Sequence, residues 1–110
     1  MRIALFCAGG LSTATLVKRI LRAAEKKGYT DVVCESFSIG ELKEKAQGSD
    51  IILLSPQIGF QEKKVREIVP DIPITVINMT DYGLMNGSKV FQTVLNVLMI
   101  DEDEGTEAIH

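Results

Sequence analysis

The fold of this chain is decided by the stretch Ile3-Ala4-Leu5-Phe6-Cys7-Ala8-Gly9-Gly10-Leu11-Ser12-Thr13-Ala14. Its first four residues are apolar and predict a buried strand. Beyond it, Val17, Ile20, Leu21 and Ala24 recur at helical spacing with basic residues between them, which predicts an amphipathic helix. The glycine pair permits a tight turn in backbone conformations that other residues rarely adopt. The stretch therefore predicts a strand, a glycine-containing loop and the N-terminus of a helix.

A loop of this kind is an anion site. Its backbone N–H groups point at one spot, and the helix dipole adds positive potential there. Ser12 or Thr13 is placed to cap the helix, and Cys7 opens the loop with a thiol that should ionise more easily than a free one. We therefore expect Cys7 to be a nucleophile beside a phosphate-binding loop, which is formed by Ala8, Gly9, Gly10, Leu11, Ser12, Thr13 and Ala14.

Length and composition indicate a single cytoplasmic domain. The chain has 110 residues, and 45% of them are hydrophobic, which is enough for one core. No apolar run approaches the roughly 20 residues of a membrane span. The run at residues 3–6 is too short, and Cys7 comes too early, for a signal peptide. Cys7 and Cys34 predict neither a disulfide framework nor a metal site, so we expect a reducing compartment and no metal or other cofactor.

Acidic residues are concentrated at the end of the chain. The formal net charge is −3, but residues 101–110 hold five acidic residues and no Lys or Arg. The remaining ten acidic and twelve basic residues give residues 1–100 a charge of +2. We therefore expect a folded domain over residues 1–100 and a disordered acidic tail over residues 101–110. No basic stripe with interleaved aromatic residues points to nucleic acid as a partner.

Apolar runs and helical patterns alternate along the chain. The expected strands are residues 2–6, 31–37, 51–54 and 74–77. The expected helices are residues 13–27, 39–46 behind a capping box from Ser38 to Glu41, 61–69, and a last helix that ends near residue 100. We expect loops at residues 55–59 and 81–87. The last helix should bury a stripe made of Val90, Val94, Leu95, Val97 and Leu98.

Four strands that alternate with four helices predict an α/β fold of the flavodoxin-like or phosphatase-like kind. The sheet should be parallel and four-stranded, with helices on both faces. Right-handed crossovers favour the strand order 2-1-3-4. The direction of winding then reverses between the first and third strands, where ligands bind in such sheets. We therefore expect the loop that follows Cys7 to face residues 55–59.

Other reactive side chains have simpler explanations. Cys34 lies in the middle of an expected strand, between Val33 and Glu35, so we assign it to packing. Asp81 and Tyr82 follow the fourth strand and are near enough to reach the site, but turn formation also accounts for them. The basic face of the first helix is a solvated face or a docking surface for a phosphorylated partner.

Three loops of the sequence resemble one family. The stretch from Cys7 to Ala14, Pro56-Gln57-Ile58 after the third strand and Tyr82-Gly83 after the fourth are similar to the cytoplasmic IIB component of the bacterial phosphotransferase system, lactose/cellobiose/chitobiose class. The resemblance covers about residues 1–100. The loop of that class reads Cys-Ser-Ala-Gly-Met-Ser-Thr-Ser. Here Ala8 and Ala14 stand in place of two serines, so two hydroxyls are missing from the loop.

The resemblance implies a phosphoryl carrier. It implies that Cys7 accepts a phosphoryl group from a phosphohistidine on a IIA protein and passes it to a sugar bound in a membrane IIC protein. In that case the chain is a phosphotransferase component, works without a metal, and meets the membrane only through IIC. Backbone N–H groups of residues 8–14 would hold the equatorial phosphoryl oxygens.

Three other classes of function are alternatives to a phosphoryl carrier. Low-molecular-weight cysteine phosphatases and arsenate reductases carry an Arg six residues after the nucleophile, where this chain has Thr13. Without that Arg, hydrolysis should be poor. A second alternative is a non-enzymatic receiver or binding module of flavodoxin-like fold. Receivers use an acidic cluster for magnesium, and residues 1–10 contain no Asp or Glu. A thiol redox protein would need a Cys-x-x-Cys motif, which is absent.

Overall fold

The sheet is parallel and has the expected order. In this computed structural model, which describes residues 1–8 and 13–99, the strands are β1 (Arg2–Cys7), β2 (Val33–Ser38), β3 (Ile51–Leu54) and β4 (Ile74–Val76). All three neighbouring pairs are parallel and the order is β2-β1-β3-β4. The flavodoxin-like α/β fold is therefore confirmed. The predicted acidic tail over residues 101–110 lies outside the described residues.

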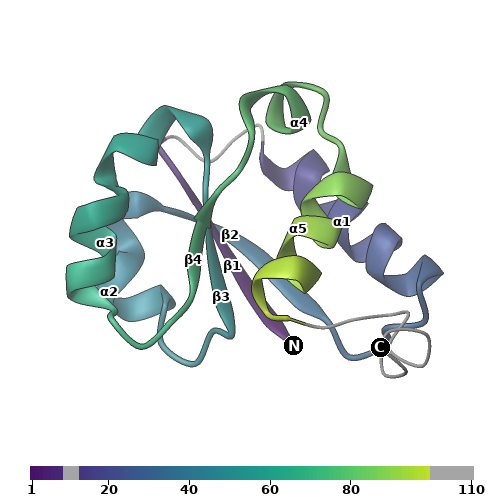
Figure 1. Ribbon diagram of the computed structural model, residues 1–110, viewed down its shortest axis with the longest axis horizontal. Helices are drawn as coiled ribbons and strands as arrows, with labels where there is room; N and C mark the ends of the chain where they lie inside the picture. The colour runs from purple at the N-terminus through teal and green to yellow at the C-terminus, as the bar shows by residue number, and fades with distance from the viewer. Residues whose placement is uncertain (9–12, 100–110) are drawn as a thin grey trace, which may run out of the picture.

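Helices cover both faces of the sheet. One layer holds α1 (Thr13–Lys26) and α5 (Gly87–Val97), and the other holds η1 (Ile39–Glu41), α2 (Leu42–Lys45) and α3 (Glu62–Ile68), as Figure 1 shows. The short helices η2 (Pro56–Gln61) and α4 (Met79–Gly83) follow β3 and β4 at the carboxyl edge of the sheet (Figure 1).

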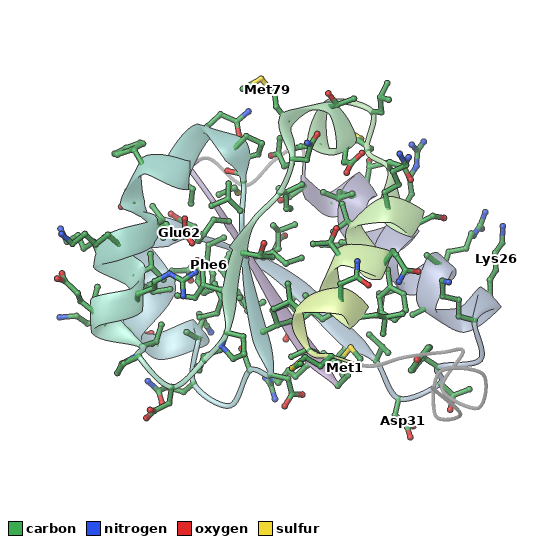
Figure 2. All side chains as sticks on the ribbon, viewed as in Figure 1. Met1, Phe6, Lys26, Asp31, Glu62 and Met79 are labelled. Atoms are coloured by element: carbon green, nitrogen blue, oxygen red, sulfur yellow. The ribbon has the colours of Figure 1, made fainter. Side chains whose placement is uncertain are left out.

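The alternation of side chains along the strands creates two cores. Odd-numbered residues of β1 and β3, such as Ile3, Leu5 and Leu53, pack with α1 and α5. Even-numbered residues, such as Phe6 and Ile52, pack with α2 and α3. Figure 2 shows Phe6 on the side of the sheet that faces α3. Because both faces of the central strands are covered, β1 from Ile3 onward and all of β3 are buried, as in most parallel sheets.

Helix α5 lies close against α1 at a glycine. A Cβ atom added at Gly87 would overlap the backbone carbonyl group of Arg19. Glycine is therefore needed here because it lets the two helices approach, and no positive φ is required. The buried residues of α5 are Gly87, Val90, Phe91, Val94 and Leu95, whereas Val97 and Leu98 are only half-buried. The predicted buried stripe was wrong in two respects. It omitted Phe91, which is buried, and it included Val97 and Leu98, which are only half-buried.

Two expected loops contain helical turns. Residues 55–59 were expected to be a loop, but η2 begins at Pro56, a residue whose fixed φ suits the first turn of a helix. Residues 81–83 belong to α4 because the Asn78 side chain caps it, accepting hydrogen bonds from the backbone N–H groups of Thr80 and Asp81. The second strand begins at Val33, two residues later than expected, and ends at Ser38. The predicted capping box from Ser38 to Glu41 is confirmed.

Candidate functional site

Cys7 ends the central strand and lies beneath the start of α1. Its side chain is only 3% exposed. The sulfur lies 3.8 Å from the hydroxyl oxygen of Thr13, the first residue of α1, and 3.8 Å from the backbone carbonyl oxygen of Phe37 on β2. The thiol can donate its proton to the Phe37 carbonyl while the Thr13 hydroxyl donates to the sulfur. The arrangement therefore offers the sulfur one acceptor and one hydroxyl.

The N-terminus of α1 adds a favourable potential for an anion. This helix has 14 residues, so its dipole is well developed, and its first turn has no acidic side chain. The Thr13 side chain is fully buried next to the sulfur, which brings the positive end of the helix against Cys7. An anionic group placed at this helix end would be stabilised by the dipole.

The loop residues expected to bind phosphate divide into two groups. Thr13 contacts Cys7, whereas Ala8 and Ala14 are exposed. Gly9, Gly10, Leu11 and Ser12 lie outside the described residues. The phosphate-binding role of the loop from Ala8 to Ala14 therefore stays a prediction.

The ends of β1 and β3 are adjacent in the sheet, whereas most of the loop after β1 lies outside the described residues. The last paired residues of these strands are Phe6 and Leu54, and the backbone N–H of Ser55 donates a 3.0 Å hydrogen bond to the carbonyl oxygen of Phe6. On the other side of β1, Cys7 is in register with Ser38. Cys7 is thus flanked by a strand end on each side.

Cys34 has a different environment from Cys7. It is in register with Ile3 at the start of β1 and packs in the core under α1 and α5, in agreement with the packing role assigned from the sequence. Burial, and then the neighbouring Glu35 carboxylate, raise the pKa of the Cys34 thiol from 9.0 to about 12. Cys34 is therefore a neutral thiol at neutral pH.

Asp81 and Tyr82 have structural contacts in α4. The backbone N–H of Asp81 donates to the Asn78 side chain, and its carbonyl oxygen accepts from the N–H of Asn86. Tyr82 is half-buried against the core under α1 and α5. These contacts support the turn-forming explanation.

Over residues 1–8 and 13–99, no group of three His, Cys, Asp or Glu side chains is arranged to hold a metal ion.

Comparison with known proteins identifies the family. A family model described as "PTS system, Lactose/Cellobiose specific IIB subunit" matches residues 2–93.

The chain belongs to this IIB family of the phosphotransferase system.

Its relatives match over most of their length. The galactose-specific EIIB component of Lactococcus lactis subsp. cremoris is 34% identical over 103 residues, which cover 87% of this chain and 94% of the relative. The cellobiose-specific EIIB component of Lactococcus lactis subsp. lactis has the same identity and coverage. The oligo-beta-mannoside-specific EIIB component of Bacillus subtilis is 28% identical over 102 residues, covering 89% of this chain and 96% of the relative.

Solved IIB structures have the same fold. The cellobiose-specific IIB component of Borrelia burgdorferi superposes with a TM-score of 0.72 at 40% identity and covers 89% of this chain and 91% of that one. The lactose-specific IIB domain of Streptococcus pneumoniae has a TM-score of 0.77 at 23% identity, over 87% of this chain and 95% of that one. The expected resemblance to the lactose/cellobiose IIB class is thus confirmed.

Three exposed apolar side chains form a rim at the carboxyl edge of the sheet, the edge at which β1 ends with Cys7. Phe60 on η2 is 82% exposed. Met79, the first residue of α4, is 75% exposed, and Leu84, which directly follows α4, is 66% exposed. Figure 2 shows Met79 at the carboxyl edge of the sheet, with its side chain pointing away from the molecule. This rim was not predicted from the sequence. Leu84 lies within an expected loop, and Phe60 and Met79 lie within two residues of one, so apolar residues at or near expected loops were a usable signal.

A basic cleft adjoins the rim. It has a volume of about 360 Å³ and lies between α1 and the start of α5, where Arg19, Arg22 and Lys26 line it. The Arg19 guanidinium donates to the backbone carbonyl oxygens of Leu84 and Met85, at 3.4 and 3.3 Å. The basic face of α1 therefore also fixes the segment that follows α4.

No helix within residues 1–8 and 13–99 is long and apolar enough to cross a membrane.

Proposed function

We propose that Cys7 carries the phosphoryl group in this IIB component, taking it from a phosphohistidine on a IIA protein and passing it to a sugar held by a membrane IIC protein. The observation that carries the proposal is the position of the Cys7 sulfur, at the end of the central strand and 3.8 Å from the Thr13 hydroxyl at the start of α1. The chain's membership of the IIB family supports a transfer role.

The first step is an in-line displacement at phosphorus. The Cys7 thiolate attacks, an S–P bond forms, and the P–N bond to the IIA imidazole breaks. The electron pair of that bond goes to the imidazole nitrogen. In the second step a sugar hydroxyl attacks the same phosphorus, the hydroxyl proton is released, and the S–P bond breaks to return the Cys7 thiolate. No net oxidation or reduction occurs.

The loop from Ala8 to Ala14 is proposed to hold the phosphoryl oxygens through its backbone N–H groups. Residues 8–17 contain no Arg or Lys, and Thr13 stands where a cysteine phosphatase has its Arg. Hydrolysis needs strong stabilisation of the equatorial oxygens. A cradle of amides without a cationic clamp suits transfer to a second acceptor more than hydrolysis.

The Cys7 sulfur is covered and must become accessible before it can attack the phosphohistidine of IIA. The Cys7 side chain is 3% exposed, so atoms that cover it must be displaced before a phosphohistidine can come into line. We propose that docking of IIA on the rim formed by Phe60, Met79 and Leu84 accompanies this displacement. Exposed apolar side chains around a buried nucleophile are suited to that task because they lose water only when a partner covers them.

Incubation with a phosphorylated IIA protein, followed by mass mapping, tests the assignment. We expect one phosphoryl group on Cys7 without added nucleotide, no normal transfer in Cys7→Ser, and nearly intact transfer in Cys34→Ser, the matched control for loss of a buried thiol. Modification of another residue, or sugar phosphorylation by Cys7→Ser, would refute the role of Cys7. Steady Cys7-dependent turnover of an aryl phosphate would instead favour the phosphatase class.

The names of the relatives do not point to one sugar as the phosphoryl acceptor. The relatives are named for galactose, cellobiose and oligo-beta-mannosides. Three sugars at similar levels of identity fit the view that specificity lies in the membrane partner.

A further inference from the structure

Ser55 is a fully buried residue with an unused hydroxyl. Its side chain is 0% exposed, and its Oγ atom has no hydrogen-bond partner among the described residues. Leaving a buried hydroxyl without a partner is costly, so proteins rarely do so without a reason. The backbone N–H of Ser55, in contrast, is used in the bond to the carbonyl oxygen of Phe6.

The strand register places Ser55 beside Cys7. Leu5 pairs with Leu53 and Phe6 with Leu54, so the next positions along these strands are Cys7 and Ser55. Ser55 keeps an extended backbone, with φ −66° and ψ 153°, which continues the alternation of side chains. Residues 5 and 53 face α1 and α5, so Cys7 and Ser55 face the same side.

The Cys7 sulfur has its carbonyl contact on the opposite flank. Phe37 belongs to β2, which pairs with one edge of β1, whereas Ser55 follows β3 on the other edge. The Phe37 carbonyl can only accept a hydrogen bond, so it favours the neutral thiol. When the thiol loses its proton, that contact becomes unfavourable, and the sulfur needs donors.

We infer that the Ser55 hydroxyl is a hydrogen-bond donor reserved for the charged form of Cys7. A neutral thiol is a weak acceptor, whereas a thiolate is a strong one. In the structure the Cys7 sulfur contacts the Thr13 hydroxyl and the Phe37 carbonyl, and the Ser55 hydroxyl makes no hydrogen bond with it. A Ser55 bond that forms when Cys7 ionises therefore stabilises the thiolate over the thiol. If Cys7 has the proposed function, Ser55 promotes formation of the nucleophile and supports the sulfur as it leaves phosphorus in the second step.

The pH dependence of Cys7 alkylation tests this inference without any partner protein. In Ser55→Ala we expect the midpoint of Cys7 alkylation by iodoacetamide to rise by about one pH unit, which is roughly tenfold less thiolate at a given pH. Ser55→Thr keeps the hydroxyl and should keep the midpoint within a few tenths of a unit. Mapping the labelled residue by mass separates Cys7 from Cys34.

Ser49→Ala is the matched control. The Ser49 hydroxyl is also buried without a partner, but Ser49 precedes β3 at the other end of that strand. Its loss should leave the midpoint unchanged. An unchanged midpoint in Ser55→Ala overturns the inference, whatever happens to thermal stability, because a hydroxyl with a purely structural or water-binding role does not select the thiolate. Failure of phosphoryl transfer to Cys7 would refute the proposed function and leave a shifted midpoint standing.

Discussion

At the scale of single residues, the two cysteines differ in what surrounds their sulfur atoms. Cys7 has the Thr13 hydroxyl and the N-terminus of α1 beside it. Cys34 lies in an apolar core with the Glu35 carboxylate as its charged neighbour. Both are buried, so exposure does not distinguish them. The polarity of the surroundings does, because the Cys7 sulfur contacts a hydroxyl and a carbonyl group, whereas apolar side chains surround Cys34.

The raised pKa of Cys34 predicts a loss of stability at alkaline pH. The unfolded thiol ionises near its ordinary pKa of 9.0, whereas the folded protein holds the proton up to about 12. Between these values the unfolded state binds fewer protons, so the free energy of unfolding falls as pH rises. Relative to Cys34→Ala, the wild type should lose about 1.4 kcal/mol per pH unit in this window. Below this pH window, the difference in free energy of unfolding between the wild type and Cys34→Ala should not depend on pH.

Urea unfolding of wild type and Cys34→Ala at several pH values makes this measurement. The cavity left by the substitution lowers the free energy of unfolding at every pH. The informative quantity is therefore the slope, against pH, of the difference in free energy of unfolding between the two proteins. A difference that stays constant from about pH 8 to pH 11 would show that ionisation of Cys34 is not linked to folding.

At the scale of secondary-structure elements, the contact between α1 and α5 depends on Gly87. The first turn of α5 lies against the backbone of Arg19, and a Cβ on Gly87 has no space without a backbone shift. This contact holds the N-terminal part of α5 against α1 and keeps Arg19 near the carbonyl oxygens of Leu84 and Met85. The packing of the two helices thus also positions the segment that follows α4.

Gly87→Ala should therefore destabilise the protein by about 1–3 kcal/mol, the range for overpacking a closely packed site. Gly83→Ala is the matched control, because Gly83 also lies in a helix and nothing lies within 4 Å of an added Cβ there. The control should be neutral or slightly stabilising, since Ala is the better helix former. Urea unfolding measures both, and equal effects of the two substitutions would contradict the packing explanation.

At the scale of the whole molecule, Cys7 and the exposed apolar rim lie at one edge of the sheet. The carboxyl ends of the strands, η2 and α4 lie at the top of Figure 1, whereas the N-terminus lies at the opposite end. Phe60, Met79 and Leu84 come from the segments that follow β3 and β4, and Arg19 belongs to the helix that follows β1. The segments that follow three of the strands therefore contribute to one surface at this edge.

Substitutions on this surface should weaken docking of IIA without changing the reactivity of Cys7. Phe60→Ser and Met79→Ser should each weaken transfer from phosphorylated IIA by roughly tenfold, because exposed aromatic and Met anchors contribute about 1–2 kcal/mol when a partner covers them. The rate of Cys7 alkylation should not change. Met99→Ser is the control, because Met99 is equally exposed but follows α5, away from this edge. If Met99→Ser weakens transfer as strongly as Met79→Ser, the rim is not the docking surface.

The sequence alone determined the fold and the position of Cys7 in it. Apolar runs at residues 3–6, 51–54 and 74–77, with helical spacing between them, were enough to derive a parallel sheet and its strand order. The capping box at Ser38 was equally readable. These features depend on residues that are close neighbours in the chain, or on packing rules that hold for all sheets of this kind. The assignment of Cys34 to the core followed from its place within a strand.

Only the tertiary structure decided what surrounds the Cys7 sulfur. The contact with the Phe37 carbonyl and the position of Ser55 follow from the register of three strands, which the apolar patterns do not specify to the residue. The helical turns η2 and α4, expected as loops, follow from the fixed φ of Pro56 and the Asn78 cap, and they expose Phe60 and Met79. Burial of a hydroxyl without a partner is a property of the packed molecule, because no residue pattern in a sequence states which polar groups packing leaves unpaired.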